Sequence, residues 1–142
     1  MKLQKGFTLV ELVIVIVILG LLAATALPRF SSLTQSARVA TLNGLAGGLR
    51  GAVSIAHATQ LVTPNAVSTD PVTLDGLSIT MINGWPAAAS VSNVLTDITG
   101  YTFTSGTPTS NFTLQTNCQV NYTDSGSNGA FPTIAVVSSG CT

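Results

Sequence analysis

Lys5-Gly6-Phe7-Thr8-Leu9-Val10-Glu11-Leu12 begins the stretch that decides the fold of this chain, and VIVIVILGLLAATALP completes it at residues 13–28. Between Phe7 and Leu27 only Glu11 is ionisable. At 1.5 Å per residue this segment makes a helix roughly 31 Å long, enough to span the hydrocarbon core of a bilayer. Since an uncharged run from Leu12 to Leu27 exceeds the usual strand length, the Val- and Ile-rich sequence predicts a helix.

Three interpretations of this segment compete. In a cleavable secretory signal, Lys2 and Lys5 form the basic region, and residues 24–26 (Ala-Thr-Ala) form the cleavage site before Leu27. In a plain transmembrane anchor, the helix has no further role. The third interpretation rests on Glu11, because an ionisable group in an apolar helix is costly unless it is paired or lies near the interface.

The N-terminal stretch closely resembles that of type IV pilins and their pseudopilin relatives. The resemblance implies that residues 1–6 are a leader, cut after Gly6, and that the same prepilin peptidase N-methylates Phe7. It also implies that Glu11 neutralises the terminal amine of Phe7 in a neighbouring subunit, within a helical homopolymer. Because a buried charge is tolerated chiefly when paired, this contact between subunits is expected to fix their register.

Gly20 and Pro28 are the two weak points of the predicted helix. Glycine costs about 1 kcal/mol relative to alanine, and proline removes a backbone donor. We expect a kink, or local unwinding on assembly, between them. The alternative is that Gly20 only allows close packing and Pro28 marks the exit from the membrane.

The low content and uneven placement of charged residues limit the partners that the chain can bind. Hydrophobic residues make up 46% of the 142 residues and charged residues only 7%, against about 25% in a typical soluble domain. All five basic residues lie at or before Arg50. No nucleic-acid partner is therefore expected for the rest of the chain, since phosphate binding needs clustered Lys or Arg.

Cys118 and Cys141 are the two cysteines, and they show no CxxC pattern or metal-ligand spacing. A disulfide between them is the better interpretation. Its loop would contribute about 3 kcal/mol, and the bond would place this part of the chain outside the reducing cytosol.

The pattern stays helical and amphipathic over residues 28–61, and Thr63-Pro64-Asn65 follows. Four glycines in this segment favour close approach of another backbone or a broken helix: Gly44, Gly47, Gly48 and Gly51. His57 is expected to be packed or solvated rather than catalytic.

Residues 62–142 are rich in Ser and Thr and predict short strands. Residues 72–74 and 77–82 flank Asp75-Gly76, a hairpin signal. Residues 83–86 (Asn-Gly-Trp-Pro) predict a turn, and Pro86 is expected to open a short helix through Leu95. Apolar alternation from Phe112 to Tyr122 predicts strands that pair with residues 133–137 and bring Cys141 beside Cys118.

This second half is similar to the globular domain of mannose-sensitive haemagglutinin-type (MSHA) pilins. The resemblance lies in residues 74–76 (LDG), 84–86 (GWP), 118–123 (CQVNYT), 132–134 (PTI) and 139–141 (SGC). It implies an α+β fold in which a long N-terminal helix, membrane-spanning in its first half, packs on a small antiparallel β-sheet. The expected organisation is a leader at 1–6, an apolar assembly helix at 7–27, an amphipathic helix at 28–61 and a globular domain at 62–142.

The expected function is that of a major-type pilin, a structural subunit of a filament used for attachment or motility. No catalytic constellation, metal site or cofactor is expected. The alternatives are a type II secretion pseudopilin and a minor pilin that binds glycans or surfaces. The expected route is an inner-membrane precursor, processed by the peptidase and the assembly machinery, then an extracellular pilus of a Gram-negative-type bacterium.

Overall fold

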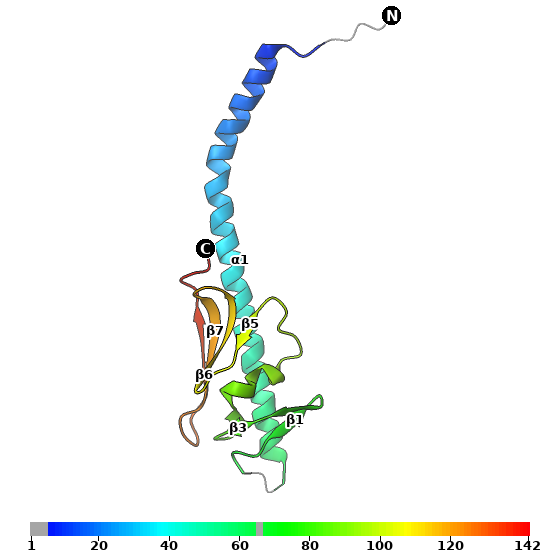
Figure 1. Ribbon diagram of the computed structural model, residues 1–142, viewed down its shortest axis with the longest axis vertical. Coiled ribbons are helices and arrows are strands. Elements are labelled where there is room, and N and C mark those ends of the chain that lie inside the picture. The colour runs from blue at the N-terminus through cyan, green and yellow to red at the C-terminus, as the bar shows by residue number, and fades with distance from the viewer. Residues whose placement is uncertain (1–5, 65–66) are drawn as a thin grey trace, which may run out of the picture. The chain divides into compact units, whose positions relative to one another are not determined.

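The computed structural model describes residues 6–64 and 67–142; Lys2 and Lys5 of the expected leader lie outside this range. Helix α1 runs from Leu9 to Val62 (Figure 1). Its end lies one residue from the predicted one. Residues up to Ser36, with Thr142, form one compact unit and Ala37–Cys141 form a second, and each is described by itself.

The apolar half of α1 has no internal core. Its large side chains from Leu9 to Leu22 are 43–77% exposed. The helix remains α-helical through Gly20 and Pro28. Unwinding between these two residues on assembly stays a prediction.

The second half of α1 carries one buried stripe. Its members recur every three or four residues, as expected for one face of a helix packed on a core: Leu42, Ala46, Leu49, Val53 and Ala56. The four glycines do not break the helix, and a Cβ placed on any of them would meet nothing within 4 Å in the described chain. The expected close approach of another backbone is therefore wrong within this chain.

Two small hairpins follow α1. Strands β1 (Val72–Leu74) and β2 (Leu77–Ile79) pair antiparallel, with Leu74 opposite Leu77. Asp75 and Gly76 form the turn with φ of 49° and 81°, as a two-residue hairpin requires. The sequence prediction of this hairpin is confirmed.

The predicted strand at 77–82 is wrong in its extent, because a second hairpin begins within it. Strand β3 (Met81–Ile82) pairs with β4 (Trp85–Pro86) across a turn with positive φ at Asn83 and Gly84. Pro86 therefore ends a strand instead of opening a helix. The short helix that follows is the 3₁₀ helix η1 (Ala88–Val94).

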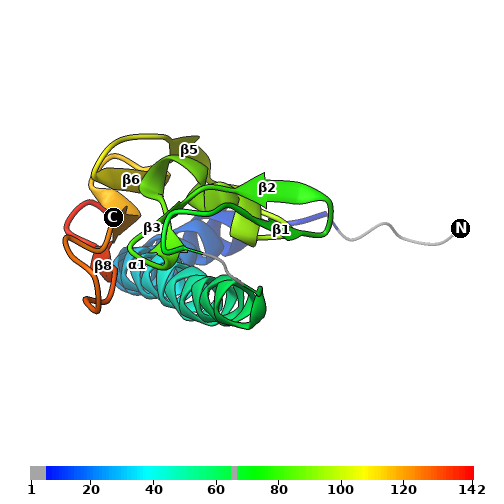
Figure 2. The ribbon, with the colours of Figure 1, turned by 90° about the horizontal axis from the view of Figure 1, so that it is seen from below.

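The main sheet has four antiparallel strands in the order β5-β6-β7-β8. Their bounds are Thr102–Thr104, Thr109–Gln115, Cys118–Thr123 and Thr133–Val137. The pairing of β7 with β8 confirms the predicted hairpin, and β5 had no counterpart in the sequence prediction. Figure 2 shows this sheet beside the second half of α1.

The core joins the buried stripe of α1 to one face of the sheet. On β7, alternate residues Cys118, Val120 and Tyr122 are fully buried, and Phe112 of β6 joins them. The hydroxyl of Tyr122 donates a 2.5 Å hydrogen bond to the carbonyl oxygen of Pro86. Burial, with a smaller contribution from the charge of Asp124, raises the pKa of Tyr122 well above its ordinary value.

Candidate functional site

The N-terminus of α1 is closed by a reciprocal pair of side chains. Glu11 Oε2 accepts hydrogen bonds from the backbone N–H of Thr8 at 2.9 Å and from the Thr8 hydroxyl at 2.7 Å. The backbone N–H of Glu11 in turn donates to Thr8 Oγ1 at 3.2 Å. This Thr-x-x-Glu arrangement is a capping box, which satisfies backbone donors that the first helical turn leaves without partners.

The expected cleavage site lies directly before this cap. Gly6 and Phe7 are exposed and precede the helix, with Phe7 78% exposed. An exposed segment outside a helix is accessible to a peptidase, whereas a helix would have to unfold first. Glu11 is exposed too, so its carboxylate can meet a group from outside the chain.

The helix that follows is long and apolar enough to cross a membrane. Its most apolar window has a mean hydropathy of 2.8, and none of that window is buried. An exposed apolar surface of this size requires lipid or other apolar helices around it. The site therefore consists of a capped carboxylate at the end of an uncovered apolar helix.

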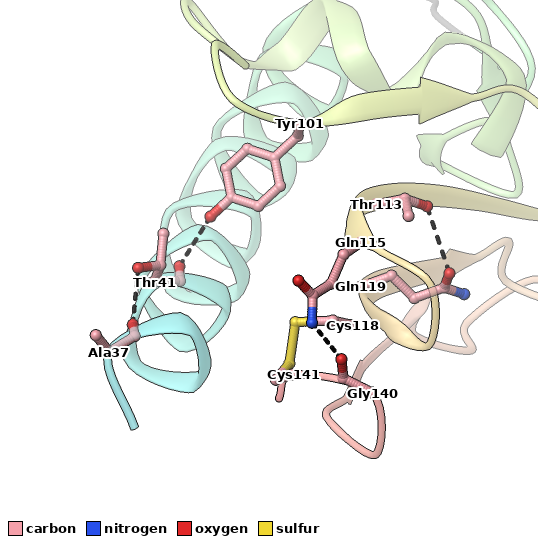
Figure 3. Close-up of a disulfide and its surroundings, with 9 residues drawn as sticks. All are labelled: Ala37, Thr41, Tyr101, Thr113, Gln115, Cys118, Gln119, Gly140 and Cys141. Atoms are coloured by element: carbon pink, nitrogen blue, oxygen red, sulfur yellow. Dashed lines mark hydrogen bonds between the residues drawn. A yellow bond between two sulfur atoms is a disulfide. The ribbon is translucent and has the colours of Figure 1, made fainter. Parts of the chain in front are cut away.

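The disulfide lies in the second compact unit (Figure 3). Cys118 and Cys141 are joined by an S–S bond of 2.03 Å with their Cα atoms 4.9 Å apart, and both are fully buried. Around them the Gln115 amide donates to the carbonyl oxygen of Gly140, and the Tyr101 hydroxyl donates to that of Thr41 at 3.1 Å. The predicted pairing of the two cysteines is confirmed.

His57 and Trp85 form a packed pair. Their rings stack with centroids 3.9 Å apart and an interplanar angle of 8°. His57 Nδ1 donates a 2.5 Å hydrogen bond to the carbonyl oxygen of Gly84, so this nitrogen carries the proton. Trp85 is only 9% exposed and contributes mainly to the core.

Within residues 6–64 and 67–142, no three His, Cys, Asp or Glu side chains gather to hold a metal ion. Each polar group described in this section instead bonds within its own element or to a neighbouring backbone.

Thr8 is the residue of this site that sequence reasoning missed. The signal was present, since a threonine three residues before a glutamate at the start of an apolar helix is a capping box.

The N-terminal region matches a known motif. Residues 1–27 match the prokaryotic N-terminal methylation motif. This motif covers the whole stretch from the expected leader to the end of the apolar run. No solved structure was found to match the chain.

Similar proteins are pilins and fimbrial proteins. The fimbrial protein EcpC of Eikenella corrodens is 38% identical over 97 residues, which cover 67% of this chain and 62% of that protein. The type IV narrow pilus major component PilA5 of Thermus thermophilus is 54% identical over 52 residues, 37% of this chain and 45% of its own length. The type IV major pilin protein PilE1 of Neisseria gonorrhoeae is 54% identical over 52 residues, 37% of this chain and 32% of its own length.

The chain thus spans less than two thirds of the length of these relatives. None of the three names denotes an enzyme, and none denotes a secretion pseudopilin. The methylation motif, the long helix with its small antiparallel sheets, and these relatives agree with one another. The chain is related to the type IV pilin family.

Proposed function

We propose that this chain is a structural, major-type subunit of a type IV pilus, a helical polymer of many copies of itself. The observation that carries the proposal is the uncovered apolar half of α1, which lies within the methylation motif at residues 1–27. Such a helix has two stable surroundings, which are lipid before assembly and other copies of the same helix afterwards.

The subunit begins as a precursor in the inner membrane. A prepilin peptidase removes residues 1–6 after Gly6 and methylates the new terminus at Phe7. Residues 7–27 hold the subunit in the bilayer until the assembly machinery extracts it into an extracellular filament. The cell is a bacterium of the Gram-negative type.

Glu11 directs the subunit into the filament. Its carboxylate meets the terminal amine of Phe7 in the neighbouring copy, so that two charges in an apolar bundle neutralise each other. Gly20 and Pro28 supply the segment of α1 that unwinds as the copies pack. The motif and the exposed position of Glu11 support these roles.

The filament serves surface attachment or motility and belongs to the MSHA-type group. Support for the subgroup comes from the resemblance of the globular half, including its C-terminal disulfide. A pseudopilin is the less favoured alternative, since the relatives are named as pilins and fimbrial proteins.

The test is the N-terminus of the mature protein. The chain is produced in a bacterium that assembles type IV pili, filaments are sheared from the cells, and the subunit is analysed by mass spectrometry and N-terminal sequencing. The proposal expects filaments built of chains that start at N-methylated Phe7. Filaments that do not contain the chain, or a mature chain that starts at Leu27 after a conventional signal cleavage, would refute it.

A further inference from the structure

The acidic side chains of the described fold are almost all engaged locally. Glu11 caps α1, and Asp70, Asp97 and Asp124 accept hydrogen bonds from the backbone N–H groups of Val67, Thr99 and Ala88. Asp75, the remaining acid, is exposed at the tip of the β1–β2 hairpin and has no hydrogen-bond or ion-pair partner among the described residues.

Asp75 borders an apolar hollow, here called the Asp75 groove. The groove has a volume of about 490 Å³ and lies where the hairpin meets α1 and the end of η1. Its walls are mostly aliphatic, and the full lining is Ala52, Ile55, Leu74, Asp75, Leu77, Asn93, Val94, Leu95 and Thr96.

The floor of this groove is uncovered, and the Asn93 amide in its wall is already hydrogen-bonded. Ile55 is 61% exposed and Leu77 is 49% exposed. The Asn93 amide donates a 2.9 Å hydrogen bond to the carbonyl oxygen of Ser78. The groove therefore presents an apolar surface with one free negative charge, and its complement is an apolar surface with one positive charge.

The chain itself carries that complement, just after the apolar span. Arg29 is exposed and its guanidinium has no partner among the described residues. Phe30 is 66% exposed and Leu33 is 62% exposed. Arg29 and Phe30 each lie three or four residues from Ala26 and from Leu33, so the four residues share one side of α1.

The other described basic residues fit less well. Arg50 donates a 3.2 Å hydrogen bond to the carbonyl oxygen of Ile134, and Arg38 is half-buried. Among the described arginines, Arg29 therefore fits the groove best, because it is exposed and lies beside exposed apolar side chains on the same face of α1.

We propose that the Asp75 groove of one copy receives residues 26–33 of a second copy, with Arg29 of the second copy paired to Asp75 of the first. This inference rests on the proposed function, because it names a contact between subunits of the filament. Burial of Ile55, Leu77, Phe30 and Leu33 supplies most of the attraction. The ion pair sets which turn of the helix enters the groove, since charge pairs contribute specificity more than affinity.

Disulfide trapping in intact filaments tests the contact directly. The full chain carrying Asp75→Cys and Arg29→Cys is assembled into pili, and sheared filaments are oxidised and run on a non-reducing gel. The inference expects a ladder of cross-linked copies, because each copy would be joined to the next. Asp75→Cys alone and Arg29→Cys alone should give no ladder, and nor should Ser127→Cys with Arg29→Cys, in which the loop residue replaces the groove residue.

Charge exchange supplies a second readout that a damaged fold cannot imitate. Asp75→Arg and Arg29→Asp should each lower the amount of sheared filament by at least about tenfold, because each places two like charges in contact. The double exchange should restore assembly. Immunoblots of whole cells check that all variants are processed and accumulate equally.

The outcomes separate the two claims. Normal filaments without a ladder for positions 29 and 75, or a ladder with Arg38→Cys in place of Arg29→Cys, would overturn this docking while the proposed function stands. Failure of the double exchange to restore assembly, with each single exchange defective, would also overturn it. Absence of the unaltered chain from any filament would refute the proposed function and this contact with it.

Discussion

The carboxylate of Glu11 lies 2.7 Å from the hydroxyl of Thr8, and the two residues cap helix α1 from within the same chain. The acid therefore has a partner before any second subunit is present. Once a chain begins at Phe7, its amine stands one residue before this cap. Two roles of Glu11, capping its own helix and pairing with a neighbour, can be separated by substitution.

Glu11→Val should leave the precursor processed and inserted in the membrane, because the apolar helix becomes more apolar. It should sharply reduce assembly, since the amine of the neighbouring Phe7 then lacks its counter-charge. The amount of sheared filament, divided by the amount of processed subunit in the membrane, measures assembly.

The matched control is Thr8→Val, which removes the capping hydroxyl but keeps the carboxylate. A capping box contributes about 1 kcal/mol, so this variant should still assemble. Normal piliation of Glu11→Val would disprove the pairing, and equal defects in both variants would assign Glu11 to capping alone.

Cys118→Ser should destabilise the globular part by about 2 to 5 kcal/mol and lower subunit abundance. Leader cleavage should continue, since the bond lies far along the chain from Gly6. Denaturant unfolding and immunoblots of the mature form measure the two effects. The double variant Cys118→Ser/Cys141→Ser is the control for a stray free thiol, and it should be no less stable than the single one. Reaction of both cysteines with a thiol-labelling reagent in native, oxidised protein would contradict the disulfide.

Tyr122→Phe should lower the free energy of unfolding by about 1 to 3 kcal/mol, because the Pro86 carbonyl oxygen loses its buried donor.

Tyr122 also predicts how the stability of the fold depends on alkaline pH. Its pKa is raised in the fold, so its contribution is complete below the unfolded pKa of about 10 and is lost as the pH rises further. The free energy of unfolding measured from pH 8 to 12 should fall above pH 10 in the original chain. The fall should be shallower in Tyr122→Phe, and parallel curves would assign the alkaline loss to other groups. Tyr101→Phe is the comparison variant, because the Tyr101 hydroxyl bonds to Thr41 near the surface and burial raises the pKa of this tyrosine too.

Filaments should tolerate 1 M salt and dissociate in detergents that solvate apolar helices. Exposed charges are screened beyond about 3 Å at this ionic strength, whereas burial of apolar surface persists. Sedimentation after each treatment measures the polymer that remains.

A chain that lacks residues 1–28 should be soluble, form its disulfide and stay monomeric. Polymerisation of this truncated chain would locate the essential contacts in the globular part instead.

The parts of the fold that were predictable from the sequence repeat a simple pattern. Residues 12–27 carry no charge and are mostly apolar, and the stripe from Leu42 to Ala56 recurs with the period of a helix. Asp75-Gly76 is a strong signal for a two-residue hairpin turn, because both residues must adopt positive φ there. Cys118, Val120 and Tyr122 alternate as a half-buried strand must.

The parts that were missed depend on contacts distant in sequence. Strand β5 is three residues long and has no buried residue, so its alternation carries no signal and only pairing with β6 defines it. Pro86 satisfies the rule for a helix start, yet pairing with Met81 holds it in a strand. The glycines of α1 lower helix propensity, but the buried stripe on the opposite positions outweighs that cost.

The Cys118–Cys141 bond also holds the edge strand of the main sheet in a closed loop. Cys118 is the first residue of β7, and the loop that the bond closes contains β8, which lies at the edge of the sheet and pairs with β7. An endopeptidase that cuts the chain between β7 and β8 would therefore leave β8 covalently attached to β7 through the disulfide. The nicked domain can consequently lose this strand only after the disulfide has been reduced.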